Sequence, residues 1–504
     1  MLILYLLTYL YQGDGYLYRS KIYLYNTASK RLEEFIPRVK NEVKMYVCGP
    51  TVYDETHIGH ARTYIAFDII RRYFEYLGYK VTFILNITDI DDKIIRRANE
   101  EGKSWKEISE YYTERFLEDI RALYIKEASH YPKVTEFINE IVNLTSLLIE
   151  KGYAYEVNGS VYFNVDKIPD YGSLSGQRIE DLIAGARVAV DPNKKNPLDF
   201  ALWKAWKPRE PWWSSPWGPG RPGWHIECVV MATKYLGEVF DIHGGGQDLV
   251  FPHHENELAI AKACFGKESF ARYWLHTGLL TIKGEKMSKS LHNIIPVRDL
   301  LKKYRAEAIR LYIASSHYRS QLDFSIDALA QYEVTLDTLY AAHDYLVSVI
   351  GKNVSNAEEL LEREEVGKVD KEVLENVNVL KNSFIDAMNN DFSTPKALSI
   401  LLKFARYITS VLSEYEELSR TTILKLYIEY LKMAEVFGVL NERKPPVDVE
   451  KLFYELLSLV IELRNYFRKQ KMWSIADNIR DKLGALGILI NDTKYRTLWR
   501  WRRK

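Results

Sequence analysis

The chain has 504 residues, of which 47% are apolar and 27% are charged. This length exceeds what one hydrophobic core serves, so we expect about two to four domains, and the apolar content excludes an intrinsically disordered chain. The 69 basic residues offset the 68 acidic residues to a formal net charge of +1, which neither supports nor excludes binding to nucleic acid.

The N-terminus is an apolar stretch, residues 1–11. It is shorter than the roughly 20 residues that span a bilayer, and it lacks the basic leader and cleavage site of a signal peptide. We expect no membrane span and interpret residues 1–20 as an N-terminal extension of unknown role, either a short extra strand or sequence added by an upstream start codon. The three widely spaced cysteines, Cys48, Cys228 and Cys264, exclude a disulfide framework and predict a reducing, cytoplasmic location.

A strand, a helix and a second strand are predicted in succession after this extension. Residues 43–48 predict a buried strand, and a loop then leads into a helix that begins near His57 and is closed by Gly78. Residues 80–87 predict the next strand. Such a unit is typical of a doubly wound parallel sheet, in which nucleotides bind at the carboxyl ends of the strands.

The pattern changes from about residue 130 to residue 212, where short alternating segments and a tryptophan- and proline-rich stretch predict an inserted subdomain. The sheet resumes with a strand at 239–242, which runs into three glycines, 244–246. Helical periodicity then dominates to the end of the chain and predicts a bundle. Its helices are expected at 327–350, 371–388, 395–418 and 449–471.

Two short motifs indicate chemistry on ATP: His57-Ile58-Gly59-His60 and, far along the chain, Lys286-Met287-Ser288-Lys289-Ser290. Imidazoles at a helix N-terminus can donate hydrogen bonds to phosphate oxygens, and the helix dipole favours the anion. A loop with two lysines can close over the pyrophosphate leaving group. In this order the motifs predict attack of a carboxylate on the α-phosphate of ATP to form an acyl-adenylate. Either motif alone could be an ordinary helix start or a solvated lysine loop.

Four potential metal ligands surround the predicted nucleotide site: Cys48, Cys228, His253 and Glu257. His253 and Glu257 are four residues apart, which places both on one face of a helix. Thiolate, imidazole and carboxylate together suit zinc. The alternative is that the two cysteines are small buried apolar residues and that His253 and Glu257 are an ordinary helical pair. Cys264 is interpreted as a core residue.

Several segments together resemble the signature sequences of cysteinyl-tRNA synthetases. They are residues 46–54 with 57–60, 86–93, 221–228, 241–246, 251–257 and 317–320. The resemblance runs from about residue 21 to the C-terminus. It implies a Rossmann-like class I catalytic domain of the α/β class with an inserted connective subdomain, followed by an all-α helical bundle. The implied ranges are 21–129 and 213–285 for the catalytic halves, 130–212 for the insertion, 286–325 for the lysine loop and stem-contact region, and 326–504 for the bundle.

The resemblance assigns zinc to Cys48, Cys228, His253 and Glu257 and gives the metal a purpose. Serine differs from cysteine only in oxygen for sulfur, and a pocket that recognises shape alone rejects such an isostere poorly. Zinc favours a thiolate over a neutral hydroxyl and therefore separates the two substrates. Because four protein ligands usually form a closed structural site, the substrate sulfur is expected to enter as a fifth ligand or to loosen one protein ligand.

Further residues receive roles from the same resemblance. Thr88, Trp224 and His243 are implied to line the amino-acid pocket, although each could simply pack. Gly59 is implied to leave room for adenine, and Lys289, with Lys286 in support, to neutralise the phosphates of ATP. Magnesium is expected to arrive with ATP rather than on a protein site of its own. His292 stands where the family usually has glycine, which questions the flexibility of the loop but not the chemistry of Lys289.

The predicted RNA contacts lie near the C-terminus. Cationic and aromatic side chains alternate there, which suits phosphates and unpaired bases, and residues 476–481 resemble the family's anticodon-binding region. The alternative is a solvated helix face with a basic tail. The candidate residues are Arg468, Lys469, Lys471, Arg480 and Lys482, with Phe467 and Trp473 among them and a basic tail from residue 494 to 504.

The sequence therefore predicts a cytoplasmic, monomeric cysteinyl-tRNA synthetase that uses ATP, L-cysteine and tRNA(Cys). Two rivals remain. One is a ligase that activates cysteine and passes it to a small amine, which would not need the whole helical region after about residue 325. The other is an RNA-binding relative with a dead active site, against which the intact His57, His60 and Lys289 argue.

Overall fold

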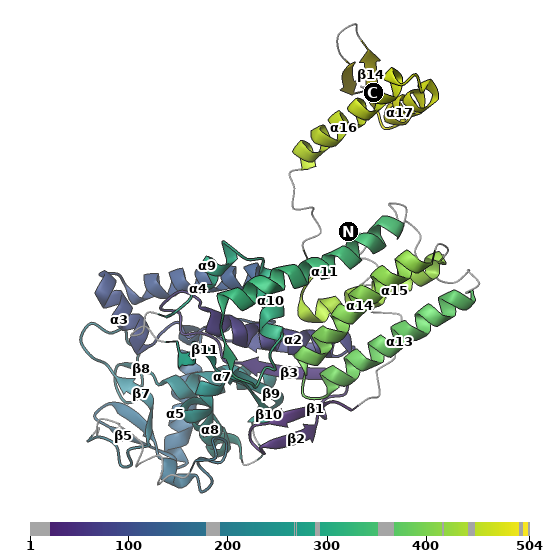
Figure 1. Ribbon diagram of the computed structural model, residues 1–504. Coiled ribbons are helices and arrows are strands. Elements are labelled where there is room, and N and C mark those ends of the chain that lie inside the picture. The colour runs from purple at the N-terminus through teal and green to yellow at the C-terminus, as the bar shows by residue number, and fades with distance from the viewer. Residues whose placement is uncertain are drawn as a thin grey trace. The chain divides into compact units, whose positions relative to one another are not determined.

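The computed structural model describes residues 21–177, 192–266, 268, 270–287, 293–350, 367–415, 418–441, 449–492 and 497–501. The chain forms two compact units, Met1–Asn441 and Glu442–Lys504, which are described separately (Figure 1). The predicted N-terminal extension, residues 1–20, lies outside the described residues. None of the helices in the described part of the chain combines the length and the apolar character that a bilayer-spanning helix needs.

A four-stranded parallel sheet forms the centre of the first unit, with the strand order β10-β9-β3-β4. Its strands are β3 (Glu42–Val47), β4 (Lys80–Leu85), β9 (Val239–Gly246) and β10 (Phe270–Thr277). Along β3, Met45 and Val47 pack into the core on one face, while Tyr46 and then Cys48 join a second core on the other. The predicted parallel sheet is confirmed, and the period of two in β3 directs Cys48 away from the face that α2 covers.

Helix α2 (Ile58–Tyr76) connects β3 to β4 and begins at the carboxyl end of β3. Helix α2 also carries a buried ion cluster: Asp68 accepts hydrogen bonds from Arg72 Nε at 2.7 Å and from Arg310 Nη2 at 2.5 Å. Burial would raise the pKa of Asp68, but the two guanidinium groups lower it to about 2. Because Arg310 also donates to the backbone carbonyl of Phe437, the cluster joins α2 to the helices that follow the catalytic sheet.

The inserted subdomain is built on an antiparallel sheet of order β5-β6-β7-β8. β8 pairs with β7 through Trp203 and Pro222, so this sheet extends beyond the predicted boundary at residue 212. The elements are η1 (Val134–Glu136), α5 (Ile138–Glu150), β5 (Ala154–Val157), β6 (Ser160–Phe163), η2 (Val165–Lys167), β7 (Phe200–Ala205) and β8 (Gly220–Pro222). β8 leads into α7, which is followed by the strands β9 and β10 of the parallel sheet.

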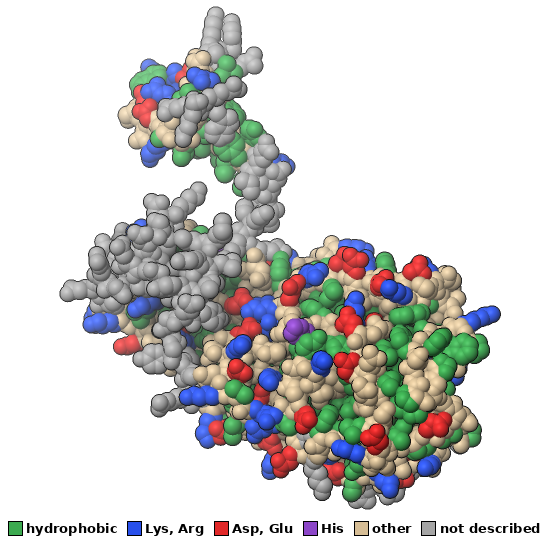
Figure 2. Space-filling model, turned by 180° about the vertical axis from the view of Figure 1, so that it is seen from behind, with side chains coloured by type: hydrophobic (Ala, Val, Ile, Leu, Met, Phe, Trp, Pro, Cys, Tyr) green, Lys and Arg blue, Asp and Glu red, His purple; other side chains and the backbone are tan. Residues whose placement is uncertain are grey.

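Further elements surround the sheet in the first unit. α3 (Asp92–Glu101) and α4 (Trp105–Ala122) follow β4, and α7 (Trp224–Leu236) and α8 (Glu255–Phe265) flank β9. The smaller elements are β1 (Tyr23–Asn26), β2 (Arg31–Glu34), η3 (Gln247–Leu249), η4 (Val250–His254), β11 (Leu280–Ile282), β12 (Glu285–Lys286), α9 (Val297–Leu301), α10 (Ala306–Ala314) and β13 (Leu322–Asp323). Acidic and basic side chains are intermixed over the face of this unit seen in Figure 2, as the small net charge leads one to expect.

Four long helices complete the first unit: α11 (Ile326–Ile350), α13 (Lys368–Asn389), α14 (Thr394–Glu414) and α15 (Arg420–Phe437). The first three correspond to the helices predicted at 327–350, 371–388 and 395–418, α15 was not predicted, and the helix predicted at 449–471 belongs to the second unit. The apolar stripes of α11, α13, α14 and α15 meet in a core that includes Leu336, Phe384, Leu401, Phe404 and Tyr430. The bundle lies beside α2 and the catalytic sheet (Figure 1).

The second unit corrects the prediction of one all-α region over 326–504. A boundary follows Asn441, and the unit combines α16 (Val449–Lys469) and α17 (Trp473–Ala485) with an antiparallel hairpin of β14 (Ile488–Asp492) and β15 (Thr497–Trp501). The predicted basic tail thus contributes a strand. The physical reason is a short alternation of apolar residues, through which Ile488, Ile490 and Trp499 pack against α16 and α17.

Candidate active site

Four side chains from separate parts of the first unit meet near the carboxyl end of β3. Cys48 follows the last residue of β3, and Cys228 lies on α7. His253 lies on η4, and Glu257 is one turn further on, in α8. Their exposed fractions are 5%, 1%, 1% and 0%, respectively. Sequence positions more than two hundred residues apart are therefore brought to one buried point, and all ligand atoms of this set lie within 4.8 Å of one another.

The distances between these atoms fit a tetrahedral zinc site. Zinc–sulfur bonds of about 2.3 Å and zinc–nitrogen or zinc–oxygen bonds of about 2.0–2.1 Å give tetrahedral edges of about 3.8 Å between two sulfurs and about 3.6 Å between sulfur and nitrogen or oxygen. Cys48 Sγ lies 3.8 Å from Cys228 Sγ and 3.6 Å from Glu257 Oε1. Cys228 Sγ lies 3.6 Å from His253 Nε2. The His253 Nε2–Glu257 Oε1 edge, at 2.7 Å, is shorter than such a site requires.

Two of the four groups are anionic at neutral pH, whereas burial, with Cys228 and Glu257 nearby, raises the pKa of the Cys48 thiol well above its ordinary value. Burial would raise the pKa of Cys228, but hydrogen bonds with Cys48 and His253 lower it to about 6. Burial would likewise raise the pKa of Glu257, but the neighbouring imidazoles of His253, His243 and His254 bring it well below its ordinary value. Both groups are therefore anionic donors at neutral pH. The anions in turn outweigh burial at His253 and raise its pKa to about 10, so a metal would displace a proton there.

Four further histidines, His225, His243, His254 and His276, surround the four donors, and the sequence did not indicate how they are arranged. His243 Nε2 lies 2.5 Å from Glu257 Oε2, the oxygen that does not face Cys48. His254 Nε2 lies 3.3 Å from Cys48 Sγ, and its Nδ1 lies 2.7 Å from His276 Nε2. Cys48, His243, His254 and Glu257 thus form an alternative donor set. His253 and His254 are adjacent in the sequence, and that doublet was the only signal that two sets could overlap.

The residues assigned to the amino-acid pocket lie around this cluster. The Trp224 ring stacks on the His253 ring with 4.2 Å between centroids and 19° between planes. Thr88 is buried and accepts a hydrogen bond from Asn86 Nδ2, and Asn86 Oδ1 accepts one from the backbone N–H of Gly49 beside Cys48. His243 contacts Glu257 and would orient this carboxylate if it binds a metal, and the contact of His243 with substrate stays a prediction.

His57 and His60 form a stacked pair at the start of α2. Their rings are 3.6 Å apart between centroids with 17° between planes. The backbone N–H of His60 donates to His57 Nδ1 at 3.3 Å, and the backbone N–H of His57 donates to His60 Nδ1 at 3.5 Å. An Nδ1 that accepts a hydrogen bond carries no proton, so each neutral ring carries its proton on Nε2. Burial, with His57 and Lys93 nearby, lowers the pKa of His60 well below its ordinary value, which keeps this ring a neutral donor.

The flanks of the lysine motif lie against the same helix start. Lys289 and its neighbours, residues 288–292, lie outside the described residues. On one side of them, Lys286 ends β12 and is exposed. On the other side, the backbone N–H of Ile58 donates to the carbonyl of Ile295 at 3.0 Å, and that of Val297 donates to the carbonyl of Thr56 at 2.8 Å. The fold therefore brings the bases of both predicted motifs together.

Gly59 provides a test of the contact between the start of α2 and the lysine motif. A Cβ atom at this position would lie 2.6 Å from Met287 Cε and 3.1 Å from the His57 ring, so the side chain beside Lys286 would have to move. We expect Gly59→Ala to raise the KM for ATP about fivefold, which corresponds to an overpacking cost of about 1 kcal/mol. The KM for the amino acid should not change. Steady-state pyrophosphate exchange with each substrate varied in turn measures both, and an unchanged KM for ATP would contradict the prediction.

The three aspartates after β4 all have structural partners. Asp89 accepts hydrogen bonds from the backbone and hydroxyl of Thr135. Asp91 caps α3, and Asp92 pairs with Lys204 at 2.6 Å and with Arg221. These contacts agree with the interpretation that this segment is structural.

The second unit carries the predicted RNA contacts. Arg468 pairs with Asp492, and Arg480 pairs with Asp477 at 3.2 Å, so both arginines are already engaged within the unit. Lys469 and Lys471 are exposed where α16 ends, and Trp473, at the start of α17, is 55% exposed. These exposed side chains, with the likewise exposed Lys482 on α17, are therefore the remaining candidates for contact with RNA.

Comparisons with known proteins agree with these observations. The family model for the class I (C) tRNA synthetase catalytic domain matches residues 34–334, and the DALR domain model matches residues 383–441. A Cysteine--tRNA ligase of Pyrobaculum aerophilum is 50% identical over 488 residues, which cover 95% of this chain and 99% of the relative. A Cysteine--tRNA ligase of Thermococcus onnurineus is 48% identical over 486 residues, which again cover 95% of this chain and 99% of the relative.

Solved structures show the same fold at low sequence identity. Methionyl-tRNA synthetase of Mycobacterium tuberculosis in complex with methionyl-adenylate matches with a TM-score of 0.58 and 16% identity over 80% of this chain and 92% of that chain. A leucyl-tRNA synthetase complex of Agrobacterium radiobacter matches with a TM-score of 0.55 and 12% identity over 81% of this chain and 86% of that chain.

Proposed function

The chain belongs to the cysteinyl-tRNA synthetase family of class I ligases, and we propose that it selects cysteine through zinc bound by Cys48, Cys228, His253 and Glu257. In this function the enzyme activates L-cysteine with ATP to cysteinyl-adenylate and transfers it to the 3′ end of tRNA(Cys). The observation that carries the metal proposal is the set of tetrahedral edges between two sulfurs, an imidazole nitrogen and a carboxylate oxygen.

Zinc in this set would supply a Lewis acid that binds the substrate sulfur as a thiolate and discriminates against the serine hydroxyl. The protein holds the donors for it. His243 fixes Glu257 through the second carboxylate oxygen. The His253 ring is held by Trp224, which stacks on its face, and by His225, whose Nδ1 lies 3.0 Å from His253 Nδ1. Such outer contacts set the orientation of metal ligands and the basicity of their donor atoms.

The start of α2 supports the adenylation step. The Nε2–H groups of His57 and His60 are donors that can bind the phosphate oxygens of ATP, on which charge develops as the carboxylate attacks. The N-terminal end of the helix adds its favourable dipole for an anion. Lys286 and Lys289 are proposed to neutralise the leaving pyrophosphate, and Gly59 to accommodate adenine. Magnesium is proposed to be bound through the phosphates of ATP.

The second unit is proposed to bind the anticodon region of tRNA. We expect the double charge reversal Lys469→Glu with Lys471→Glu to raise the KM for tRNA about tenfold and to make aminoacylation less dependent on salt, because two phosphate contacts are lost. Cysteine-dependent pyrophosphate exchange needs no tRNA and should be unchanged. An unaltered KM for tRNA would contradict the assignment of these lysines.

The test of the function is aminoacylation of unfractionated tRNA by the zinc-loaded protein with labelled cysteine, and with labelled serine as control. Cysteine-selective charging is the expected result. Cysteine-dependent pyrophosphate exchange without charging would favour the rival ligase that acts on a small amine, and loss of both would favour the RNA-binding relative. The matches over nearly the whole length of Cysteine--tRNA ligases favour tRNA as acceptor. The cytoplasmic location and the monomeric state stay predictions.

A further inference from the structure

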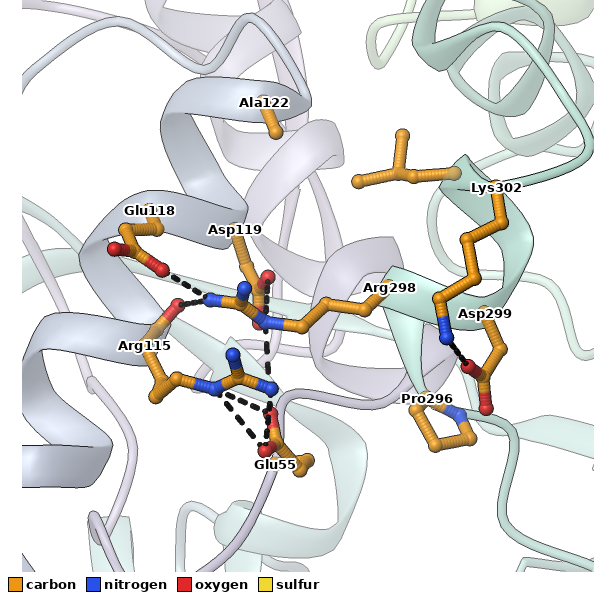
Figure 3. A pocket seen from close by; sticks show the side chains of 10 residues that line it. Glu55, Arg115, Glu118, Asp119, Ala122, Pro296, Arg298, Asp299 and Lys302 are labelled. Atoms are coloured by element: carbon orange, nitrogen blue, oxygen red, sulfur yellow. Dashed lines mark hydrogen bonds and ion pairs between the residues drawn. The ribbon is translucent and has the colours of Figure 1, made fainter.

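A charged cavity of about 610 Å³ lies beside the start of α2, between α4 and α9. Figure 3 shows two arginines in it side by side, Arg115 from α4 and Arg298 from α9, facing three carboxylates. The carboxylates are Glu55, which precedes His57 by two residues, and Glu118 and Asp119 on α4. We call these five residues the arginine clamp.

Arg298 contacts all three carboxylates of the clamp. Its Nη2 lies 2.6 Å from Glu118 Oε2, and its Nε lies 2.9 Å from Asp119 Oδ1 and 3.6 Å from Glu55 Oε2. Nη2 also donates to the backbone carbonyl of Arg115 at 3.0 Å. Arg298 is thereby tied both to α4 and to the segment that leads into α2.

Arg115 holds Glu55 from the other side. Its Nη2 donates to Glu55 Oε1 at 2.7 Å, and its Nε donates to both carboxylate oxygens at 3.1 and 3.3 Å. A fork of this kind fixes the direction of the carboxylate as well as its distance. Glu55 is thus a shared partner of both arginines.

The backbone next to Arg298 is paired with the backbone on either side of His57. Val297 donates to Thr56, and Ile58 donates to Ile295, so residues 295–297 form a short antiparallel pairing with residues 56–58. Pro296 lies opposite His57 in this pairing. The same segment follows the lysine motif, so a shift of α9 would move His57 and the base of the lysine loop together.

The arginine clamp needs the positive charge of Arg298 to balance its carboxylates. Three carboxylates face two guanidinium groups, and Asp119 is only 2% exposed while Arg298 is 25% exposed. Burial raises the pKa of Asp119 to about 6 against the opposing effect of Arg298. Without Arg298, α9 would lose its ion pairs with α4 and with Glu55. The three carboxylates would then share Arg115 alone, and like-charge repulsion would favour separation of the segment before His57 from α4.

We infer that Arg298 is a positioning residue for the ATP site, which acts by holding residues 295–297 against the start of α2. The inference rests on the proposed function, since it concerns the formation of cysteinyl-adenylate. It predicts a defect in the use of ATP that leaves the metal centre intact, because the clamp lies against the segment before His57 and contacts none of the four metal donors.

The experiment compares Arg298→Ala with Arg305→Ala in pyrophosphate exchange. Arg305 is a matched control: it is 32% exposed and pairs with Glu333 at 2.5 Å and Asp337 at 2.6 Å, away from the clamp. We expect Arg298→Ala to lower kcat/KM for ATP about tenfold or more, because small misplacements of reacting groups are costly. The KM for cysteine and the zinc content should match those of wild type. Arg298→Lys, which keeps the charge but not the fork, should fall between Arg298→Ala and wild type.

Glu55→Gln tests the clamp from its other side and should shift kcat/KM for ATP in the same direction, which decides the matter if Arg298→Ala does not fold. Equal values for the Arg298→Ala and Arg305→Ala proteins would overturn the inference, as would a defect in the KM for cysteine of the same size as that for ATP. A wild-type protein without cysteine-dependent exchange would instead refute the proposed function.

Discussion

Cys228→Ser is expected to lower the affinity for zinc by more than about a hundredfold and to abolish cysteine-dependent pyrophosphate exchange. Loss of a residue that only supports a metal ligand already costs up to about a hundredfold in affinity, and loss of a ligand itself should cost more. The reason is that Cys228 supplies the anionic sulfur of the cluster: its pKa is lowered to about 6, whereas a serine hydroxyl remains protonated at neutral pH. The substitution would replace the sulfur donor that lies 3.8 Å from Cys48 Sγ and 3.6 Å from His253 Nε2. Metal analysis of the purified protein and the exchange assay measure the two effects.

Cys264→Ser is the matched control for this substitution. Cys264 is also buried, but it lies on α8 in the apolar core and belongs to neither donor set, and burial raises its pKa to about 12. We expect its zinc content and KM for cysteine to equal those of wild type. A Cys228→Ser protein that holds one zinc ion and keeps the KM for cysteine would refute the assignment of the metal ligands.

The two overlapping donor sets can be separated in the same way. His253→Ala removes a donor of the first set, and His254→Ala removes a donor of the second. Because the tetrahedral edges favour the first set, His253→Ala should lose zinc, while His254→Ala should retain it with reduced affinity. The reverse order would move the metal to Cys48, His243, His254 and Glu257.

His57→Ser is expected to lower the kcat of pyrophosphate exchange by about a hundredfold to a thousandfold, the range seen when one preorganised donor to a developing charge is removed. Serine keeps the capping function, since its hydroxyl can accept the hydrogen bond that His57 Nδ1 accepts from the backbone of His60. What it removes is the Nε2–H donor. The thermal midpoint should therefore change little, and zinc content and the KM for cysteine should not change.

A matched pair of measurements separates this effect from a loss of helix stability. His57→Ala removes both the cap and the donor, so it should lose the same activity as His57→Ser and in addition about 1 kcal/mol of stability. If the serine variant were as active as wild type while the alanine variant were not, His57 would act as a helix cap only.

Local patterns in the sequence predicted the framework of the site. The buried strand before Cys48, the helix from His57 and the strand that ends near Thr88 give β3, α2 and β4, because each has a clear period and clear end signals. The alternation along β3 also explains why Cys48 faces α7 and α8. Residue type and the four-residue spacing of His253 and Glu257 made Cys48, Cys228, His253 and Glu257 candidates for a zinc site. Family resemblance then decided for zinc, because the spacing alone also fitted two buried cysteines and an ordinary helical pair.

Other features could not be predicted because they depend on tertiary contacts between polar residues. The resemblance predicts that His243 contacts substrate, and only the fold shows that His243 also contacts the second oxygen of Glu257. Glu55, Asp119 and Arg298 have the appearance of ordinary surface charges in the sequence, yet they meet beside the start of α2. The terminal hairpin was missed because its strands are short and follow helices with a strong period.

X-ray absorption at the zinc edge, recorded with and without cysteine, most directly tests whether the metal selects the substrate through its sulfur. The resting spectrum should contain two sulfur neighbours at about 2.3 Å, from Cys48 and Cys228, together with nitrogen and oxygen neighbours. Added cysteine should increase the number of sulfur neighbours by one, and added serine should leave it unchanged. A sulfur count that stays at two with saturating cysteine would contradict thiolate recognition by zinc and leave the metal a structural role.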